Sequence, residues 1–453
     1  MNKKNKFSVF FFLFSFFILH SLSAQDEPRS LEAARLDTIQ YGTETEIAAL
    51  IQTLTTEGAD YLDNEIITLV ENTHNQKILS GAFAFFGERE KSGLENRAIR
   101  AIEEQDSEKN ETILAAVDYL GKVKAVNAAP ALRKLIETGE KRFVNAAIRS
   151  FGRISADGGS AGADAAAYLI DFYGKNSPDD ESRREVIVAL GAAGSAGAVE
   201  FLAAIASDNG ERATLRMAAL ESLAKIGDPG GLDAVLGCVS ASDPNVRSTA
   251  VTALGPFSGK AVDDVILDAF RDSYYRTRIA AAQASRQRKL AAAVPYLKFR
   301  AERDEVPAVR EDSVRALGAI ADSESVKTLE DLFTGRKNND RVRITAGEML
   351  MQITPEQFLD RFVMELDEAK QKNQTALYNG LLKILGGTKS ANLEPITRRL
   401  MQNSGVVERS YALDMAVNNS LTGLSPEIKT ITDDRNESLA AKARKTLEKL
   451  GIQ

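Results

Sequence analysis

The chain has 453 residues, 44% of them apolar, with no tryptophan and a single cysteine, Cys238. One cysteine excludes an internal disulfide, and two histidines are too few for a zinc site built from a Cys/His cluster. The formal net charge is −7, and it becomes −10 once the three lysines of the first 24 residues are left out. An acidic chain is a poor general nucleic-acid binder, because such proteins present a basic surface.

Residues 1–24 have the features of a secretory signal peptide. Three lysines precede residues 7–19 (FSVFFFLFSFFIL), an apolar segment too short to span a membrane comfortably, and small residues lead up to Ala24. We expect cleavage near Ala24 and export of the mature protein to the periplasm or out of the cell. No membrane span is expected after cleavage.

One phrase recurs along the rest of the chain. Residues 243–255 read DPNVRSTAVTALG, and residues 304–318 read DEVPAVREDSVRALG. Aligned on the final glycine, thirteen copies follow one another at intervals of 31 to 39 residues, which identifies a structural repeat. The final position is held by Thr55, Gly87, Gly121, Gly152, Gly191, Ala224, Gly255, Arg286, Gly318, Met351, Gly386, Val417 and Glu448. Alanine stands five residues earlier in nine copies, at Ala82, Ala116, Ala147, Ala219, Ala250, Ala281, Ala346, Ala412 and Ala443.

Each copy predicts a pair of helices. Val246, Ala250, Ala253 and Leu254 are spaced as the apolar stripe of an amphipathic helix, and a second apolar stripe follows in each copy. We expect Gly255 and its equivalents to end the first helix in the left-handed conformation. A lone hairpin cannot bury its apolar face, whereas a stack of hairpins shares one core. The sequence therefore predicts an all-α fold, an α-α superhelix (solenoid) of about 13 helical hairpins.

The phrase, written D-P-x-V-R-x-x-A-x-x-A-L-G, resembles the HEAT repeat in its short variety, named after PBS-lyase-type proteins. The resemblance covers about residues 38–453 and implies a helical solenoid that binds partners along its curved face. It also implies that the arginine of the phrase pairs with an aspartate of the turn between units. We expect no lyase activity, because export would remove the chain from cytoplasmic pigment assembly.

The arginine column divides the chain. Residues 25–155 hold HEAT-like units with apolar residues in this column, residues 156–165 are predicted to be a glycine-rich insertion loop, and residues 166–453 hold HEAT-like units with an Asp-Arg ladder. The apolar residues are Ile47, Leu79, Ile113 and Val144. The arginines are Arg183, Arg216, Arg247, Arg278, Arg310 and Arg343, followed by Arg409 in a later unit. The aspartates expected to pair with them lie three to eight residues earlier, at Asp180, Asp208, Asp243, Asp272, Asp304 and Asp340.

One unit, residues 271–303, carries nine basic residues against two acidic ones, with aromatic residues between them. One interpretation is an anion-binding patch for an acidic partner protein or an anionic envelope polymer. The other is a set of cations at a helix C-terminus, where the helix dipole favours positive charge. The candidate partner-binding residues are Tyr274, Tyr275, Arg276, Arg286, Arg288, Lys289, Lys298 and Arg300.

The sequence offers no convincing catalytic constellation. Residues 158–162 (GGSAG) match the G-x-S-x-G nucleophile elbow, but that elbow needs a preceding strand and a later histidine, whereas His74 comes earlier. We therefore expect no enzyme activity, no catalytic residue, no cofactor and no bound metal.

Three functions remain open. The first is an exported scaffold for protein–protein interaction. The second is an enzyme, or an accessory subunit of an envelope enzyme, with residues 156–164 as part of its site. The third is a structural spacer that binds an anionic envelope polymer.

Overall fold

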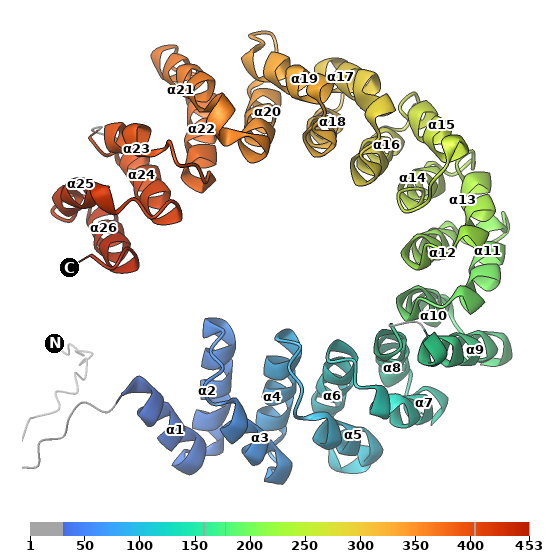
Figure 1. The fold of residues 1–453 in the computed structure, drawn as a ribbon. Coiled ribbons are helices and arrows are strands. Elements are labelled where there is room, and N and C mark those ends of the chain that lie inside the picture. Colours follow the sequence, from blue (N-terminus) through green and yellow to red (C-terminus); the bar gives the residue numbers. More distant parts are fainter. Residues whose placement is uncertain (1–29, 139, 157–158, 177, 403–404, 453) are drawn as a thin grey trace, which may run out of the picture. The chain divides into compact units, whose positions relative to one another are not determined.

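The computed structural model describes residues 30–138, 140–156, 159–176, 178–402 and 405–452. The predicted signal peptide lies outside these ranges. Within them the chain forms 26 α-helices and no strand, as the sequence predicts (Figure 1). None of the helices in these ranges combines the length and the apolar character that a membrane crossing requires. The chain divides into two compact units, and the boundary between Ala115 and Ala116 lies inside helix α6 (Asn110–Lys122).

Unit 1 contains the first five helices and the start of α6. They are α1 (Leu31–Tyr41), α2 (Glu44–Glu57), α3 (Asp63–Asn72), α4 (Gln76–Glu88) and α5 (Glu95–Glu103). Helix α2 packs against α1 and α4, and α3 packs against α4. Two buried acids receive charged partners here: Arg89 and Lys91 both donate to the Asp63 carboxylate, and Arg97 pairs with Glu108 at 2.7 Å.

Unit 2 continues from α6 to the end of the described chain. Its further helices are α7 (Ala129–Thr138), α8 (Lys141–Ile154), α9 (Gly159–Asn176), α10 (Asp180–Ala193), α11 (Val199–Ser207), α12 (Ala213–Ile226), α13 (Leu232–Cys238), α14 (Pro244–Ala253), α15 (Lys260–Ala269), α16 (Tyr275–Arg288), α17 (Val294–Arg303), α18 (Pro307–Ile320), α19 (Ser323–Thr334), α20 (Asp340–Ile353), α21 (Pro355–Gln371), α22 (Thr375–Gly387), α23 (Glu394–Met401), α24 (Val406–Asn418), α25 (Ser425–Ile431) and α26 (Glu437–Lys449).

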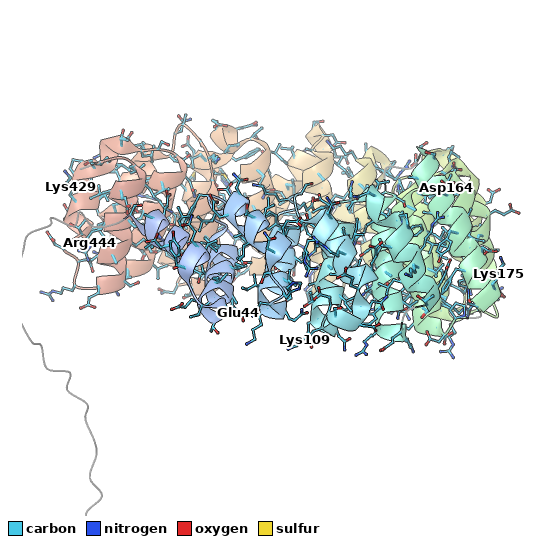
Figure 2. The ribbon with its side chains drawn as sticks, turned by 90° about the horizontal axis from the view of Figure 1, so that it is seen from below. Glu44, Lys109, Asp164, Lys175, Lys429 and Arg444 are labelled. Carbon is cyan, nitrogen blue, oxygen red and sulfur yellow. The ribbon has the colours of Figure 1, made fainter. Side chains whose placement is uncertain are left out.

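The helices of unit 2 form two layers that follow an arc (Figure 1). The even-numbered helices from α8 to α26 lie on the concave side and are called the inner layer; the odd-numbered helices form the outer layer. Each inner helix packs against the next inner helix and against the outer helix that precedes it in the chain. Figure 2 labels Lys429 on α25 and Arg444 on α26 of the last hairpin, where Arg444 donates to the Thr432 carbonyl at 2.9 Å.

The alanine column faces the interior, as the apolar stripe predicts. All nine alanines of the column are fully buried, and so is Leu254. In the first units, Ile47, Leu79 and Ile113 of the arginine column are buried as well. The helical periodicity of the sequence therefore correctly identifies the face of each first helix that packs into the stack.

The recurring glycine is not a left-handed C-cap, so that prediction is wrong: Gly255 lies two residues beyond the end of α14 and has no positive φ. Gly152, Gly191 and Gly318 each lie two residues before the end of their helix. A Cβ on Gly152 would lie 2.6 Å from the Ala189 carbonyl oxygen, and a Cβ on Gly191 would lie 2.6 Å from the Ser222 hydroxyl. Glycine is therefore required where one inner helix closely approaches the next. The left-handed residues come three positions later, at Lys124, Gly194, Gly227, Lys289 and Ala321.

The stretch predicted to be an insertion loop, residues 156–165, is helical over most of its described length. It forms the start of α9, an 18-residue helix of the outer layer on which Figure 2 labels Lys175. A Cβ on Gly162 would lie 2.8 Å from the Ala193 carbonyl oxygen. The small residues thus let α9 approach the end of α10, and the loop prediction is wrong for residues 159–165.

Candidate functional site

The arginine column forms a ladder of ion pairs that connects consecutive hairpins of unit 2. Arg247 Nε lies 3.0 Å from the Asp272 carboxylate, and Arg278 donates two hydrogen bonds of 2.7 and 2.8 Å to Asp304. The acid lies 25 or 26 residues after the arginine, in the turn of the following unit. Further pairs of this kind are Arg183 with Glu211, Arg343 with Glu365, and Arg409 with Asp434.

The sequence identifies the ladder arginines but assigns most of them the wrong acid. Several of the arginines reach the preceding turn through its backbone: Arg278 donates to the Asp272 carbonyl at 3.0 Å, and Arg310 donates to the Asp304 carbonyl at 2.7 Å. Arg216 likewise donates to the Ala206 carbonyl at 2.9 Å. The carboxylates of Asp272 and Asp304 bind the arginine of the unit before, Arg247 and Arg278 respectively.

The remaining predicted partners have other roles or minor ones. Asp243 is the N-cap of α14 and accepts from the backbone N–H of Asn245 and Val246. Asp208 accepts from the N–H of Gly210, and Asp180 lies 3.4 Å from Arg183 as a second partner beside Glu211. Short turns favour such local bonds, because an aspartate reaches the N–H groups two or three residues ahead.

The ladder keeps its carboxylates charged. Burial raises the pKa of Asp304, but hydrogen bonds from Arg278 and from the Val306 N–H outweigh burial and hold the pKa below its usual range. The pKa of Asp272 is lowered in the same way by Arg247. These residues are therefore stabilising elements between the hairpins, and they are not available to a ligand.

Several basic residues of 271–303 have acidic partners within the fold. Arg278 and Arg300 both bind Asp304, and Lys298 lies 4.0 Å from Asp331. Arg288 binds Asp263 of the preceding outer helix, and Arg271 binds Asp268. The predicted partner-binding residues Arg288, Lys298 and Arg300 thus have acidic partners within the fold.

The other predicted partner-binding residues of this unit lie at the ends of α16 or on its exposed inner face. Tyr274 donates to the Asn245 side chain at 2.9 Å, and Arg276 Nε donates to the Tyr275 hydroxyl at 3.2 Å. Arg276, Arg286 and Lys289 are exposed and form no ion pair with any residue in the described ranges. Lys289 is the left-handed C-cap of α16. These three cations are what remains of the predicted patch.

The exposed stripe of each inner helix faces the hollow of the arc, because its other sides pack on neighbouring helices. On α16 this stripe follows Arg276, Ile279, Gln283 and Arg286, spaced at helical intervals. Charges on the stripes pair sideways between adjacent inner helices. Such pairs are Arg149 with Glu185 at 3.2 Å, Arg341 with Glu311, and Lys442 with Asp414 at 2.7 Å.

A groove opens on the inner face between α20 and α22, and we call it the α20–α22 groove. Its volume is about 560 Å³, within the range typical of ligand sites. Its apolar lining consists of Ile344, Met351, Pro355 and Ile384. Its remaining lining consists of Glu348, Gln352, Gly380, Lys383, Gly387, Thr388 and Lys389.

Three charged side chains line the α20–α22 groove: Glu348, Lys383 and Lys389. Glu348 and Lys383 hold the same repeat position, three residues before the glycine column, on neighbouring helices. Within the described ranges they form no ion pair with each other or with another residue, and neither does Lys389. No motif in the sequence predicts this groove. Its available signal was the pair Gly380 and Gly387, seven residues apart in a single helix.

Two further grooves accompany it. On the inner face, a groove of about 320 Å³ lies along α12, α14 and α16 and is lined by polar residues such as Glu221, Lys225 and Thr252. On the outer layer, a groove of about 620 Å³ lies between α21 and α23, with Leu359 and Met364 in its lining. The groove along α12, α14 and α16 also has charges of both signs without an ion pair in the described ranges, Glu221 and Lys225, but its apolar lining consists only of Ala224, Ala253 and Pro256. In the outer groove, Arg399 pairs with Asp367. The α20–α22 groove combines charges of both signs with larger apolar side chains.

The catalytic motif that the sequence contains has the wrong surroundings. Ser160 lies in the first turn of α9, and the element before it is helix α8 where the nucleophile elbow needs a strand. His74 is exposed between α3 and α4. Among the described residues, no group of three or more His, Cys, Asp or Glu side chains is arranged to hold a metal ion.

The comparisons with known proteins agree with this architecture. The family described as "Spirochaete HEAT repeat protein" matches residues 39–446. No curated protein matches the chain.

Solved structures that resemble the chain are similar in fold alone. A crystal structure of Kap121p is 11% identical, with a TM-score of 0.45 over 92% of this chain and 53% of that one. Kap121p bound to Pho4p is 13% identical, with a TM-score of 0.44 over 92% and 53%. The chain therefore spans about half the length of these structures.

Proposed function

The chain belongs to the Spirochaete HEAT repeat protein family, and from this we propose that it is an exported scaffold that binds a protein partner along the inner face of unit 2. Helical solenoids commonly bind large partners along such curved surfaces. The observation that carries the proposal is the α20–α22 groove, where an apolar floor is bordered by charges without partners among the described residues.

Rigid connections between hairpins support this function. The ladder pairs Arg247–Asp272 and Arg278–Asp304 tie successive turns together, and the tight glycine contacts fix the spacing of α8 and α10. A surface that is already ordered loses less conformational entropy on binding than a flexible one. The inner face is therefore suited to recognise a partner without rearranging.

Export and a non-catalytic role complete the proposal. Export rests on the charged start, apolar segment and small residues of 1–24. Binding rather than catalysis is favoured by the surroundings of Ser160 and His74, which are not those of a nucleophile and its base.

A second candidate is a spacer that holds an anionic envelope polymer. The observation in its favour is the set of exposed cations Arg276, Arg286 and Lys289, which form no ion pair among the described residues. They are spread over the length of α16 and its C-cap, and a polymer could contact them in succession. We place this candidate second because an anionic polymer would not explain the apolar floor of the α20–α22 groove.

The test is recovery of a partner from envelope extract on the immobilised mature chain, residues 25–453. We expect one protein in a stoichiometric amount, resistant to enzymes that degrade polysaccharide and nucleic acid. Recovery of polymer alone would support the spacer, and recovery of nothing would contradict both. Export is tested by N-terminal sequencing of tagged protein from an extracytoplasmic fraction. A start near Gln25 is expected, and an uncleaved cytoplasmic chain would contradict export.

A further inference from the structure

We infer that the α20–α22 groove binds an extended segment of the protein partner in which an apolar side chain stands beside acidic ones. This inference rests on the proposed scaffold function and names the chemistry of its ligand. It goes beyond the repeat architecture, because the features that carry it occur together at this step of unit 2.

The apolar floor calls for an apolar side chain. Ile344 on α20 and Ile384 on α22 are only partly buried, and they line the groove together with Met351 and Pro355. An apolar group placed here would remove this surface from water, which is favourable in proportion to the area covered. A fully polar ligand would make no favourable apolar contact with this surface.

The wall of the groove is open to a ligand at Gly387. A Cβ on Gly380 would lie 2.5 Å from Ile344, so packing accounts for that glycine. A Cβ on Gly387 would meet no atom within 4 Å, and Gly387 has no left-handed backbone angle. Gly387 is the last residue of α22, and neither packing nor a left-handed conformation requires glycine there. Its bare backbone lets a ligand chain approach α22 closely.

The charges select an acidic segment. Lys383 and Lys389 are exposed, line the groove on the α22 side, and form no ion pair within the described residues. Some other cations of the inner face already have acids, as Lys442 has Asp414. Glu348 is the single acid of the lining, so cations outnumber it two to one. Carboxylates beside the apolar side chain would complement this balance.

The test uses a random library of twelve-residue peptides displayed on phage, selected on the immobilised mature chain. We expect enriched peptides to share an apolar residue flanked by Asp or Glu. Binding of the best peptide, measured by fluorescence anisotropy, should fall at least tenfold in Gly387→Leu. The control is Gly174→Leu on outer helix α9, where a Cβ likewise meets no atom within 4 Å and binding should not change. Leucine favours helix over glycine, so both variants keep their fold.

A charge exchange tests the second half of the inference. The double variant Lys383→Glu with Lys389→Glu should lose the acidic peptide at least tenfold and should enrich basic peptides in a new selection. The matched control is Lys327→Glu with Lys337→Glu, which changes two exposed lysines in α19 and the turn after it. It should leave the selected peptides unchanged.

Several outcomes would overturn the inference. They are no enrichment, a consensus without acids, or equal binding by wild type and Gly387→Leu. Any of these, combined with recovery of a stoichiometric envelope protein, would leave the scaffold function standing and refute only the groove's specificity. Failure to recover any protein would refute the scaffold function itself.

Discussion

Arg278 and Asp304 are joined by two hydrogen bonds of 2.7 and 2.8 Å, and both side chains are buried. The pair connects α16 with the turn before α18, so it belongs to two successive hairpins. The pKa of the Arg278 guanidinium is raised chiefly by its bonds to Asp304. Each partner therefore keeps the other charged in a place that water does not reach.

Breaking this pair should be costly and local. Asp304→Asn leaves a buried guanidinium with reduced compensation, and we expect a loss of about 3 to 5 kcal/mol of stability. Hydrogen exchange should show loss of protection in α16 to α18 and little change in α24 to α26, since each unit contacts only its neighbours. The control Asp268→Asn removes an exposed pair and should cost less than about 1 kcal/mol. Equal losses in both variants would contradict the structural role of the ladder.

The ladder also predicts that the free energy of unfolding decreases at low pH. Folding lowers the pKa of Asp272 and Asp304 below the unfolded value of about 3.9. A carboxylate of this kind contributes its stability above the unfolded pKa and loses it as pH falls through the folded pKa. Urea midpoints should therefore change little between about pH 7 and 5 and fall below about pH 4. In Asp304→Asn that fall should be shallower; an identical pH profile would refute the linkage.

Two glycines should respond to alanine with opposite signs. Gly152→Ala places a methyl group 2.6 Å from the Ala189 carbonyl oxygen and should destabilise by about 1 to 3 kcal/mol. Gly174→Ala adds a methyl group in open space on α9 and should stabilise by about 0.5 to 1 kcal/mol. Thermal melting of the two variants checks this. A neutral Gly152→Ala would mean that the inner helices are not in such close contact.

The exposed cations of α16 should be dispensable for binding the protein partner. Arg286 and Lys289 lie at the C-terminal end of α16, where each cation contributes at most about 0.3 to 1 kcal/mol, and Arg276 lies in the first turn, where the dipole does not favour it, so changing all three to Gln should cost little stability. We expect the triple variant to retain the envelope partner as well as wild type does across a salt series. Loss of the partner in the variant, with a wild-type affinity that falls steeply with salt, would favour an anionic ligand at α16.

The sequence predicts which faces are buried far better than how closely the helices approach. Ala250 and Leu254 are buried as their spacing requires, because periodicity records the direction of a side chain around its helix. The role of Gly191 escapes the sequence, since a glycine at a helix end and a glycine at a helix crossing look alike in one chain. For the same reason, the glycines at the start of α9, around Gly162, predict a loop where the structure has a helix.

The candidate site shows the same limit. Arg247 and Arg278 are recognised in the sequence, but a guanidinium can reach either the turn before it or the turn after it. Which acid it binds depends on how the two hairpins pack, and the repeat pattern does not specify that. The α20–α22 groove depends on the lateral distance between two helices that are separated by α21. No local pattern around Lys383 or Gly387 encodes that distance.

Site-specific photo-crosslinking in envelope extract tests the central claim most directly. A benzoylphenylalanine would replace Thr252 or Asn379 on the inner helices α14 and α22, and Lys175 or Met364 on the outer helices α9 and α21, all of them exposed positions. The account predicts that the same partner protein is crosslinked from both inner positions and from neither outer position. Crosslinks from the outer positions alone would contradict binding along the inner face of unit 2.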